Sequence, residues 1–429
     1  MHDLCDAGPG RAVMRLSRTA TFWFLAVILV MFLFAASAPS PLYAVYQARW
    51  HFSTATLTVV YAAYVAALLA ALVWAGSASD RLGRRPVLAV AVLIECVAML
   101  AFATAGDTTM LYVARLLQGL GTGIATGAIG AMLFDVQPRE RPGAGALAGS
   151  VAPAVGLAFG GLGSSLVTTF APPRAPLVFW ALAAFFVAGL GAVLAMPETV
   201  SQRTRWHPAL RPRVGVPPAL NATFATLVPC IVAFWALSGL YLSLGPSIVR
   251  NVLHEQSGLA GGLVIFTLSA TGAAGSIATR SWSPRLAIIS GSGTLVAGVV
   301  LTLIAVNRTD SALFYLGTAI VGVGFGPAFT GVFRLLTAEV GSDQRAGVVG
   351  AVYVAAYLAL GVPAVLAGVA VPWIGLASVF DIYASAVLIL AVTTAVAFVV
   401  GSSGRSWRTG TAVPGHCPCP GTVAVHHSA

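Results

Sequence analysis

Apolar segments of about twenty residues recur along the whole chain and are separated by short polar stretches. Each is long enough to cross a hydrocarbon core of about 30 Å as a helix. The strands of a membrane β-barrel would be about 10 residues long with alternating polarity, so a barrel is excluded. The pattern predicts an all-α polytopic membrane protein with twelve spans, at 21–46, 54–76, 86–105, 110–133, 143–169, 175–196, 219–247, 259–279, 285–306, 311–336, 346–371 and 376–400.

The polar stretches divide the chain into two halves. The longest of them, residues 197–218, holds four arginines and five prolines and is typical of a linker. Arg141 and Arg345 precede the fifth and eleventh spans 204 residues apart, and the same separation relates Arg81 to Arg285. Several coincidences at one spacing indicate two related six-helix halves. We expect an N-terminal segment at 1–20, a bundle at 21–196, the linker, a bundle at 219–400 and a disordered cytoplasmic tail at 401–429.

Charge is scarce and its placement is informative. The chain is 58% hydrophobic and 8% charged, with a formal charge of +10, and all its basic residues are arginines. With the N-terminus in the cytoplasm, 18 arginines lie on the cytoplasmic side, four lie outside and Arg115 lies within a span. This is the positive-inside bias that sets topology. The excess of arginine therefore indicates how the chain is oriented in the membrane, and no nucleic-acid partner is expected.

A charged turn, GSASDRLGRR, joins the second and third spans at residues 76–85. The pattern G-x-x-x-D-R-x-G-R-R at this place resembles the signature of the major facilitator superfamily. The resemblance implies two pseudo-symmetric six-helix bundles around a central cavity, and a cytoplasmic conformational lock. In that lock Arg84 pairs with an acid at the end of span four, and Asp80 interacts with the partner half while the cytoplasmic side is closed. The alternative is a basic loop that only enforces topology. The residues of the lock would be Gly76, Asp80, Arg81, Gly83, Arg84, Arg85 and Asp135.

Span four carries an intramembrane arginine in the run Arg115-Leu-Leu-Gln-Gly, which resembles the R-x-x-Q-G pattern of the same superfamily. In proton-coupled members this arginine is associated with proton transfer; the alternative is that Arg115 extends to the outer interface. Glu95 lies near the middle of span three, at a depth about 6 Å from Arg115. We therefore predict a Glu95–Arg115 pair, which is either part of proton coupling or purely structural.

Glycines in spans four and five predict close helix packing. Gly119 and Gly123 lie four residues apart in span four. Span five resembles the G-P-x-x-G-G element of drug–proton antiporters, but Leu157 replaces its proline and Ala152 its first glycine. Generic small-residue packing is the alternative. The packing or kink residues of span five would be Pro153, Gly156, Gly160 and Gly161.

Other polar and aromatic residues lie within spans. Asp381, about one turn into span twelve, is either a second proton site or an interfacial acid. The superfamily's cavity is lined by spans one, two, four, seven and eleven, so aromatic and amide residues there are candidate cavity residues, or else belong to an interfacial aromatic belt. These residues are Tyr43, Tyr46, Tyr61, Tyr64, Gln118, Trp235, Tyr241, Tyr353 and Tyr357.

The five cysteines predict no disulfide framework, since two lie in spans and three in the terminal segments. The stretch HCPCPGTVAVHH near the C-terminus resembles a metal-binding tract, but we interpret it as disordered. We expect no metal, no cofactor and no enzymatic activity.

These features favour a secondary active transporter working by alternating access. The leading hypothesis is proton-coupled export of drug-like or metabolite compounds, with the proton gradient as energy source. The alternatives are a metabolite uptake symporter or facilitator, and a membrane sensor that keeps the fold without transport. The expected setting is a bacterial cytoplasmic membrane, with both termini cytoplasmic, a monomeric chain, and a small molecule and the bilayer as partners.

Overall fold

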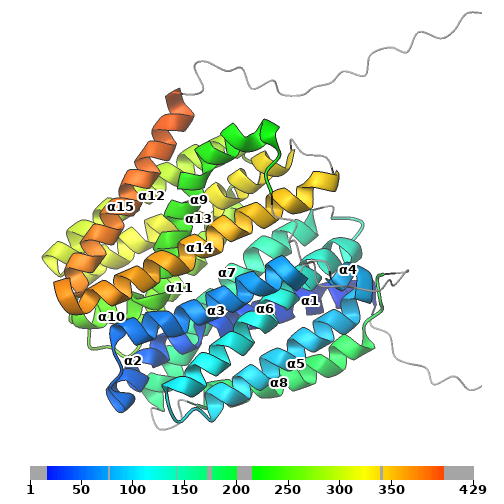
Figure 1. Cartoon of the computed structure of the whole chain (residues 1–429), viewed down its shortest axis with the longest axis horizontal. Helices are drawn as coiled ribbons and strands as arrows, with labels where there is room; N and C mark the ends of the chain where they lie inside the picture. Colours follow the sequence, from blue (N-terminus) through cyan, green and yellow to red (C-terminus); the bar gives the residue numbers. More distant parts are fainter. Residues whose placement is uncertain are drawn as a thin grey trace, which may run out of the picture.

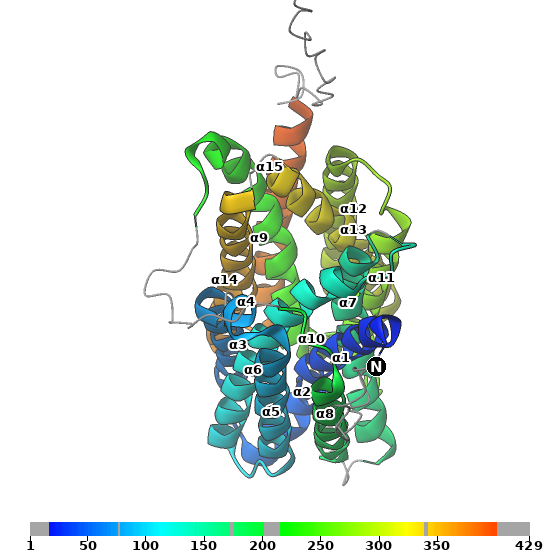
Figure 2. The ribbon, with the colours of Figure 1, turned by 90° about the vertical axis from the view of Figure 1, so that its right-hand side faces the viewer.

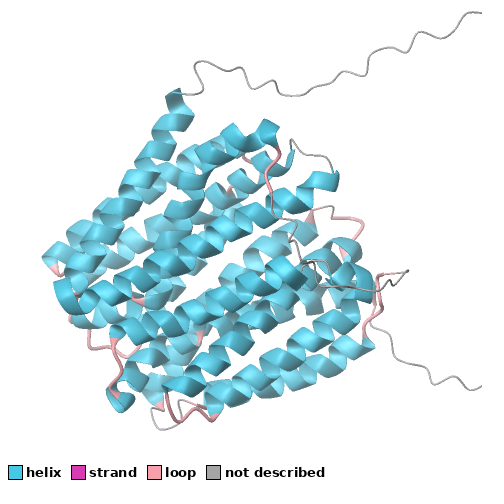
Figure 3. Cartoon of the chain, in the orientation of Figure 1, coloured by secondary structure: helices cyan, strands magenta, loops and turns pink. Residues whose placement is uncertain are grey.

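The structure is a computed structural model that describes residues 17–75, 78–141, 143–171, 176–200, 215–338 and 342–400. All regular secondary structure in these ranges is helical (Figure 3). Twelve helical segments among them are long and apolar enough to cross a membrane, which confirms the predicted all-α polytopic fold. Most of the linker and the expected C-terminal tail lie outside the described residues.

The helices form two groups that pack side by side (Figures 1 and 2). The first group contains α1 (Arg18–Ser37), α2 (Pro39–Trp50), α3 (Thr54–Ala75), α4 (Ala78–Leu82), α5 (Arg84–Ala103), α6 (Thr108–Val136), α7 (Ala144–Phe170) and α8 (Leu177–Ala195). The second begins with the 3₁₀ turn η2 (Pro218–Leu220) and contains α9 (Asn221–Ser243), α10 (Gly245–Asn251), α11 (Ala260–Ala278), α12 (Pro284–Arg308), α13 (Ser311–Ala338), α14 (Ser342–Ile374) and α15 (Leu376–Val400). We call them the first and second bundles.

Prolines interrupt the first span of each bundle. Proline lacks the N–H that a helix interior requires. The first membrane segment bends between α1 and α2, where Pro39 and Pro41 open the second helix. The corresponding segment of the second bundle breaks between α9 and α10, next to Pro246. By contrast, Pro153 and Pro229 lie inside α7 and α9 without ending them.

The bundles meet along two pairs of helices, α3 with α14 and α7 with α11. We call the end at which α1 begins and α8 ends the linker end. The opposite end, where α2 leads into α3 and α10 into α11, is the far end. In Figure 1 the bundles are inclined to one another, and α2 lies near α10 at the far end.

Close packing between the bundles is concentrated toward the far end. A Cβ on Gly262 of α11 would lie 2.7 Å from Ser165 Cβ of α7, and one on Gly368 of α14 would lie 2.7 Å from Thr58 Cβ of α3. Such distances leave no room for a methyl group, so glycine permits the contact. The far end is therefore the closed end of the molecule in this conformation.

Candidate functional site

The charged turn lies at the linker end, where α4 and α5 follow the end of α3. Gly83 joins these helices with φ +102°, a backbone conformation that favours glycine. The predicted ion pair between Arg84 and Asp135, at the end of α6, is present. Arg84 also contacts Asp80 at 3.5 Å, one helical turn earlier. Gly76 lies outside the described residues.

Asp80 makes no ion pair with the second bundle among the described residues. Its side chain is 62% exposed and its ion pair is with Arg84 of the same bundle. The superfamily signature predicts that this aspartate contacts the partner bundle when the cytoplasmic side is closed. In this structure the far end is the closed end, and Asp80 pairs with Arg84 of its own bundle instead.

Glu198, just after α8, completes the turn and was not predicted from the sequence. Its two carboxylate oxygens accept hydrogen bonds from the backbone N–H groups of Arg84, at 2.9 Å, and Arg85, at 3.3 Å. Helices begin with unsatisfied N–H groups, and a carboxylate there is favourable. The available signal was an acid directly after span six, on the same side of the predicted membrane as the turn.

Arg115 occupies the interior of the first bundle and is fully buried. Its guanidinium donates hydrogen bonds to the Tyr43 hydroxyl, the Ala36 carbonyl and the Gln118 side chain. It also lies 5.4 Å from the ring centroid of Tyr64, within the range of a cation–π contact. The side chain therefore does not extend to the outer interface.

The break between α1 and α2 supplies carbonyl oxygens to this network. In an unbroken helix the Ala35 carbonyl would accept from the N–H of residue 39, but residue 39 is proline. Gln118 Nε2 donates to the Ala35 carbonyl instead, at 2.9 Å, and Arg115 Nη1 donates to the Ala36 carbonyl, at 2.9 Å. Freed backbone groups in a membrane helix need such partners. The proline break and the polar run of span four are thus parts of one site.

The predicted direct pair between Glu95 and Arg115 is wrong. No ion pair joins them among the residues that the structure describes. Gln118 lies between: its Oε1 accepts from Arg115 Nη1 at 2.6 Å, and its Nε2 lies 3.5 Å from Glu95 Oε1. Residues 115 and 118 share one face of α6, so the amide occupies the space that the arginine would need. The Thr122 hydroxyl lies beside the Glu95 carboxyl, and Arg115 Nη2 is buried without a hydrogen-bond partner among the described residues.

Glycines hold the helices of the first bundle close together. A Cβ on Gly119 or Gly123 of α6 would lie within 2.8 Å of an alanine Cβ on α3. Gly156 and Gly160 of α7 contact α1 in the same way, whereas Gly161 faces Ile265 of the second bundle. These residues pack helices, as the sequence predicts; α7 continues through Pro153.

Seven of the nine candidate cavity residues separate into three groups; the other two, Tyr46 and Tyr61, are buried in the core of the protein. Tyr43, Tyr64 and Gln118 are buried around Arg115 and serve that network, which differs from the prediction that they line a cavity. Tyr241 is also buried: its hydroxyl accepts from Thr318 at 3.2 Å, and its ring stacks on Phe314 within the second bundle.

The third group forms an aromatic cluster on the second bundle. Trp235 of α9 lies 5.1 Å from the Tyr357 ring of α14, and Tyr357 lies 6.1 Å from Tyr353. The sequence reasoning missed the partners on α13, although their four-residue spacing places them on one face. The aromatic cluster comprises Trp235, Phe325, Phe329, Phe333, Tyr353 and Tyr357.

Asp381 is remote from this chemistry. It lies in the second turn of α15, near the far end, and accepts a hydrogen bond from Asn307 of α12 at 3.2 Å. The structure does not bring it together with Glu95 or Arg115. Its surroundings fit the interfacial alternative better than a second proton site.

Comparison with known proteins identifies the family. A model of the Major Facilitator Superfamily matches residues 23–364. The chain belongs to this superfamily. As a superfamily member it is a multi-pass membrane transporter, and its twelve helices agree with that assignment. The Arg84 turn and the Arg115 run therefore lie in a transporter.

Curated relatives show which named proteins this superfamily member is similar to. Multidrug resistance protein MdtL of Klebsiella pneumoniae is 26% identical over 307 residues, covering 67% of this chain and 74% of the relative. The protein of the same name from Shigella flexneri is 26% identical over 289 residues, covering 65% and 70%.

Two solved structures share the fold. The nucleoside transporter NupG aligns with a TM-score of 0.66 at 14% identity, covering 88% of this chain and 98% of that chain. A bacterial homologue of the human lysosomal transporter Spinster, in an inward-facing and unoccupied conformation, aligns with a TM-score of 0.66 at 14% identity, covering 92% and 98%.

Proposed function

We propose that this transporter exports small amphipathic compounds in exchange for protons, by rocking of the two bundles. The observation that carries the proposal is Glu95: a carboxyl group fully buried in the first bundle, beside the Thr122 hydroxyl and with Arg115 held away by Gln118. An intramembrane acid of this kind is expensive to keep charged and marks proton pathways.

The network offers a route for coupling protonation to movement. Glu95, Gln118 and Arg115 connect α5 and α6 to the α1 carbonyls at the proline break. A protonated Glu95 needs no cation, whereas an ionised one favours direct contact with Arg115. Direct contact between ionised Glu95 and Arg115 would require Gln118 to leave its place between them. This movement would change the hydrogen bonds that join α6 to α1. Proton transfer is thereby tied to the packing of the first bundle.

The conformation fits the loading state of an exporter. The bundles pack tightly at the far end, and Asp80 at the linker end is exposed. The arginine bias supports a cytoplasmic position for the linker end. An exporter in this state would take up its substrate from the cytoplasm or the membrane's inner leaflet. The relatives named multidrug resistance proteins support the same direction.

The test is transport in an efflux-deficient bacterium. Cells producing the wild-type chain should resist a panel of lipophilic antibiotics and dyes and should retain less dye than cells without it. The variant Glu95→Gln removes the ionisable group and should lose both effects at normal expression. Glu140→Gln, at an exposed acid in the loop between α6 and α7, is the matched control and should keep them.

Membrane vesicles separate coupling from binding. Wild-type vesicles should show proton movement when substrate is added, and Glu95→Gln vesicles should show none. If cells that produce the wild-type chain and cells that lack it resist every compound of the panel equally, export is refuted. Dye accumulation that increases with expression would instead indicate uptake, and equal pH dependence in Glu95→Gln and wild type would remove Glu95 from coupling.

A further inference from the structure

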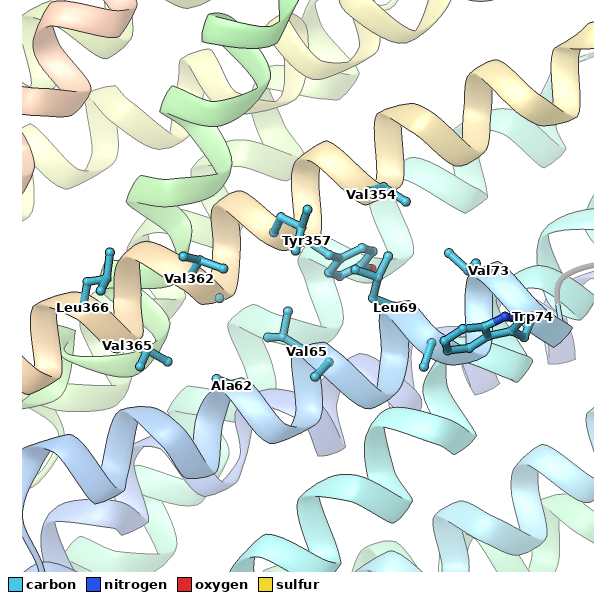
Figure 4. Close-up of a pocket in the computed structure, with 14 residues that line it drawn as sticks. Ala62, Val65, Leu69, Val73, Trp74, Val354, Tyr357, Val362, Val365 and Leu366 are labelled. Atoms are coloured by element: carbon cyan, nitrogen blue, oxygen red, sulfur yellow. The ribbon is translucent and has the colours of Figure 1, made fainter. Parts of the chain in front are cut away.

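A groove of about 560 Å³ runs between α3 and α14, one of the two helix pairs that join the bundles (Figure 4). It extends from Ala62 and Leu366 to Trp74 near the linker end of α3. Its volume lies within the range of small-molecule sites, which is about 300–1,000 Å³. The described residues that line it include no charged side chain. The groove therefore suits an uncharged, apolar occupant.

The groove opens toward the membrane. Large apolar side chains on its rim are exposed, including Trp74 at 51%, Val362 at 51% and Leu366 at 65%. They lie on two membrane-spanning helices, so lipid is the medium that they face. A compound dissolved in the bilayer can reach this surface without passing through water.

The floor of the groove is shared with the aromatic cluster. Tyr357 lines the groove, and Figure 4 shows its ring beside Leu69 of α3. The same ring lies 5.1 Å from Trp235 at an angle of 62°. Trp235 Nε1 is buried and has no hydrogen-bond partner among the described residues. An indole N–H normally finds an acceptor when it is buried, so this donor is open to a ligand.

We propose that the groove is a lateral access route by which a neutral, planar aromatic compound with a hydrogen-bond acceptor passes from the membrane to the aromatic cluster. The inference names the substrate class and route of the exporter proposed above, and it rests on that function. The aromatic rings supply edge-to-face and stacked contacts, Trp235 Nε1 supplies the polar anchor, and Tyr357 belongs both to the groove lining and to the cluster.

The probe for this route is benzophenone, an uncharged aromatic ketone that labels nearby C–H bonds on illumination. The protein is placed in lipid nanodiscs, mixed with benzophenone and illuminated after increasing delays, and labelled residues are located by mass spectrometry. Saturable label at Trp235 or Tyr357 is expected in the wild type. Trp235→Phe removes the donor and should raise the half-saturating concentration about fivefold at Tyr357.

Filling the groove tests the route. Ala66→Phe adds a ring within the groove and should slow the appearance of label in the cluster about tenfold. Val59→Phe adds the same ring to an exposed position of α3 outside the groove lining and should leave the rate unchanged. Ala70→Phe, a second groove residue, replaces Ala66→Phe if that variant does not fold.

Three results decide the inference. Slow labelling in the groove variants alone supports it. Equal rates in Ala66→Phe and Val59→Phe would overturn it and leave the groove as a lipid-filled surface, and an absence of saturable label in the wild type would overturn the aromatic site. Labelling as expected without any export in cells would instead remove the proposed function and leave the route standing.

Discussion

The connection between α1 and α6 can be tested by replacing Gln118 with leucine. The change keeps a similar side-chain volume but removes the amide that links three groups. Gln118 donates to the Ala35 carbonyl at 2.9 Å, accepts from Arg115 Nη1 at 2.6 Å and lies 3.5 Å from Glu95 Oε1. Gln118→Leu should therefore destabilise the folded protein.

The magnitude follows from the bonds lost. Two hydrogen bonds at the average value for membrane proteins contribute about 1 kcal/mol together. The Ala35 carbonyl would also be left without its side-chain donor, because Pro39 provides no N–H, and an unsatisfied buried group costs about 1–3 kcal/mol. Arg115 Nη1 keeps its bond to Ala36, so nothing is added for the charge. The expected loss is about 2–4 kcal/mol of unfolding free energy.

Unfolding can be followed through Cys96 and Cys230, which are buried thiols that become reactive when the bundles open. The three remaining cysteines would first be changed to serine. The fraction of protein whose thiols react is then measured against the mole fraction of sodium dodecyl sulfate in detergent micelles. This titration gives a free energy for each variant.

The control is Thr21→Val, which also replaces a buried polar side chain of the first bundle with an apolar one. The Thr21 hydroxyl has no hydrogen-bond partner in the described part of the chain, so its removal should change stability by less than about 0.5 kcal/mol. If Gln118→Leu is no more destabilising than Thr21→Val, the bonds to the proline break do not hold α6 against α1.

The same titration and a distance measurement check three further expectations. Gly160→Ala should destabilise by about 1–3 kcal/mol because its Cβ would meet the α1 backbone, whereas Gly191→Ala, with open space around it, should not. Asp135→Asn should cost no more than about 1 kcal/mol, since its ion pair is partly exposed. Gly368→Ala should weaken closure of the far end, seen as longer spin-label distances between α3 and α14, with Gly293→Ala as the unaffected control.

Hydropathy alone predicted the spans, because helix length in a membrane is fixed by bilayer thickness. The span predicted at 376–400 begins where α15 does, at Leu376. The first segment runs longer than predicted, from Arg18 to Trp50, since α2 continues beyond the proline break. The Arg84–Asp135 ion pair, which the resemblance of the turn to the superfamily signature implies, also lies where expected.

The interior of the site was less accessible to sequence reasoning. Counting residues along each helix gives the depth of a side chain in the membrane, and this count correctly predicted that Glu95 lies near Arg115. The direction in which each side chain points around the helix axis could not be counted in the same way. That direction places Gln118 between them. The contribution of Ala35 and Ala36 was invisible for a different reason: it comes from backbone oxygens, which have no sequence signature of their own.

That last contribution affects how the chain can vary. An acceptor on the main chain survives every substitution at its own position, so a scan of side chains at residues 35 and 36 would score them only for size. The position that controls the Ala35 acceptor is four residues further on, at Pro39, where any other amino acid restores a competing donor. Replacement would therefore be poorly tolerated at Pro39, although its side chain makes no hydrogen bond. A scan of side chains would not detect the Ala35 carbonyl oxygen that Pro39 leaves free.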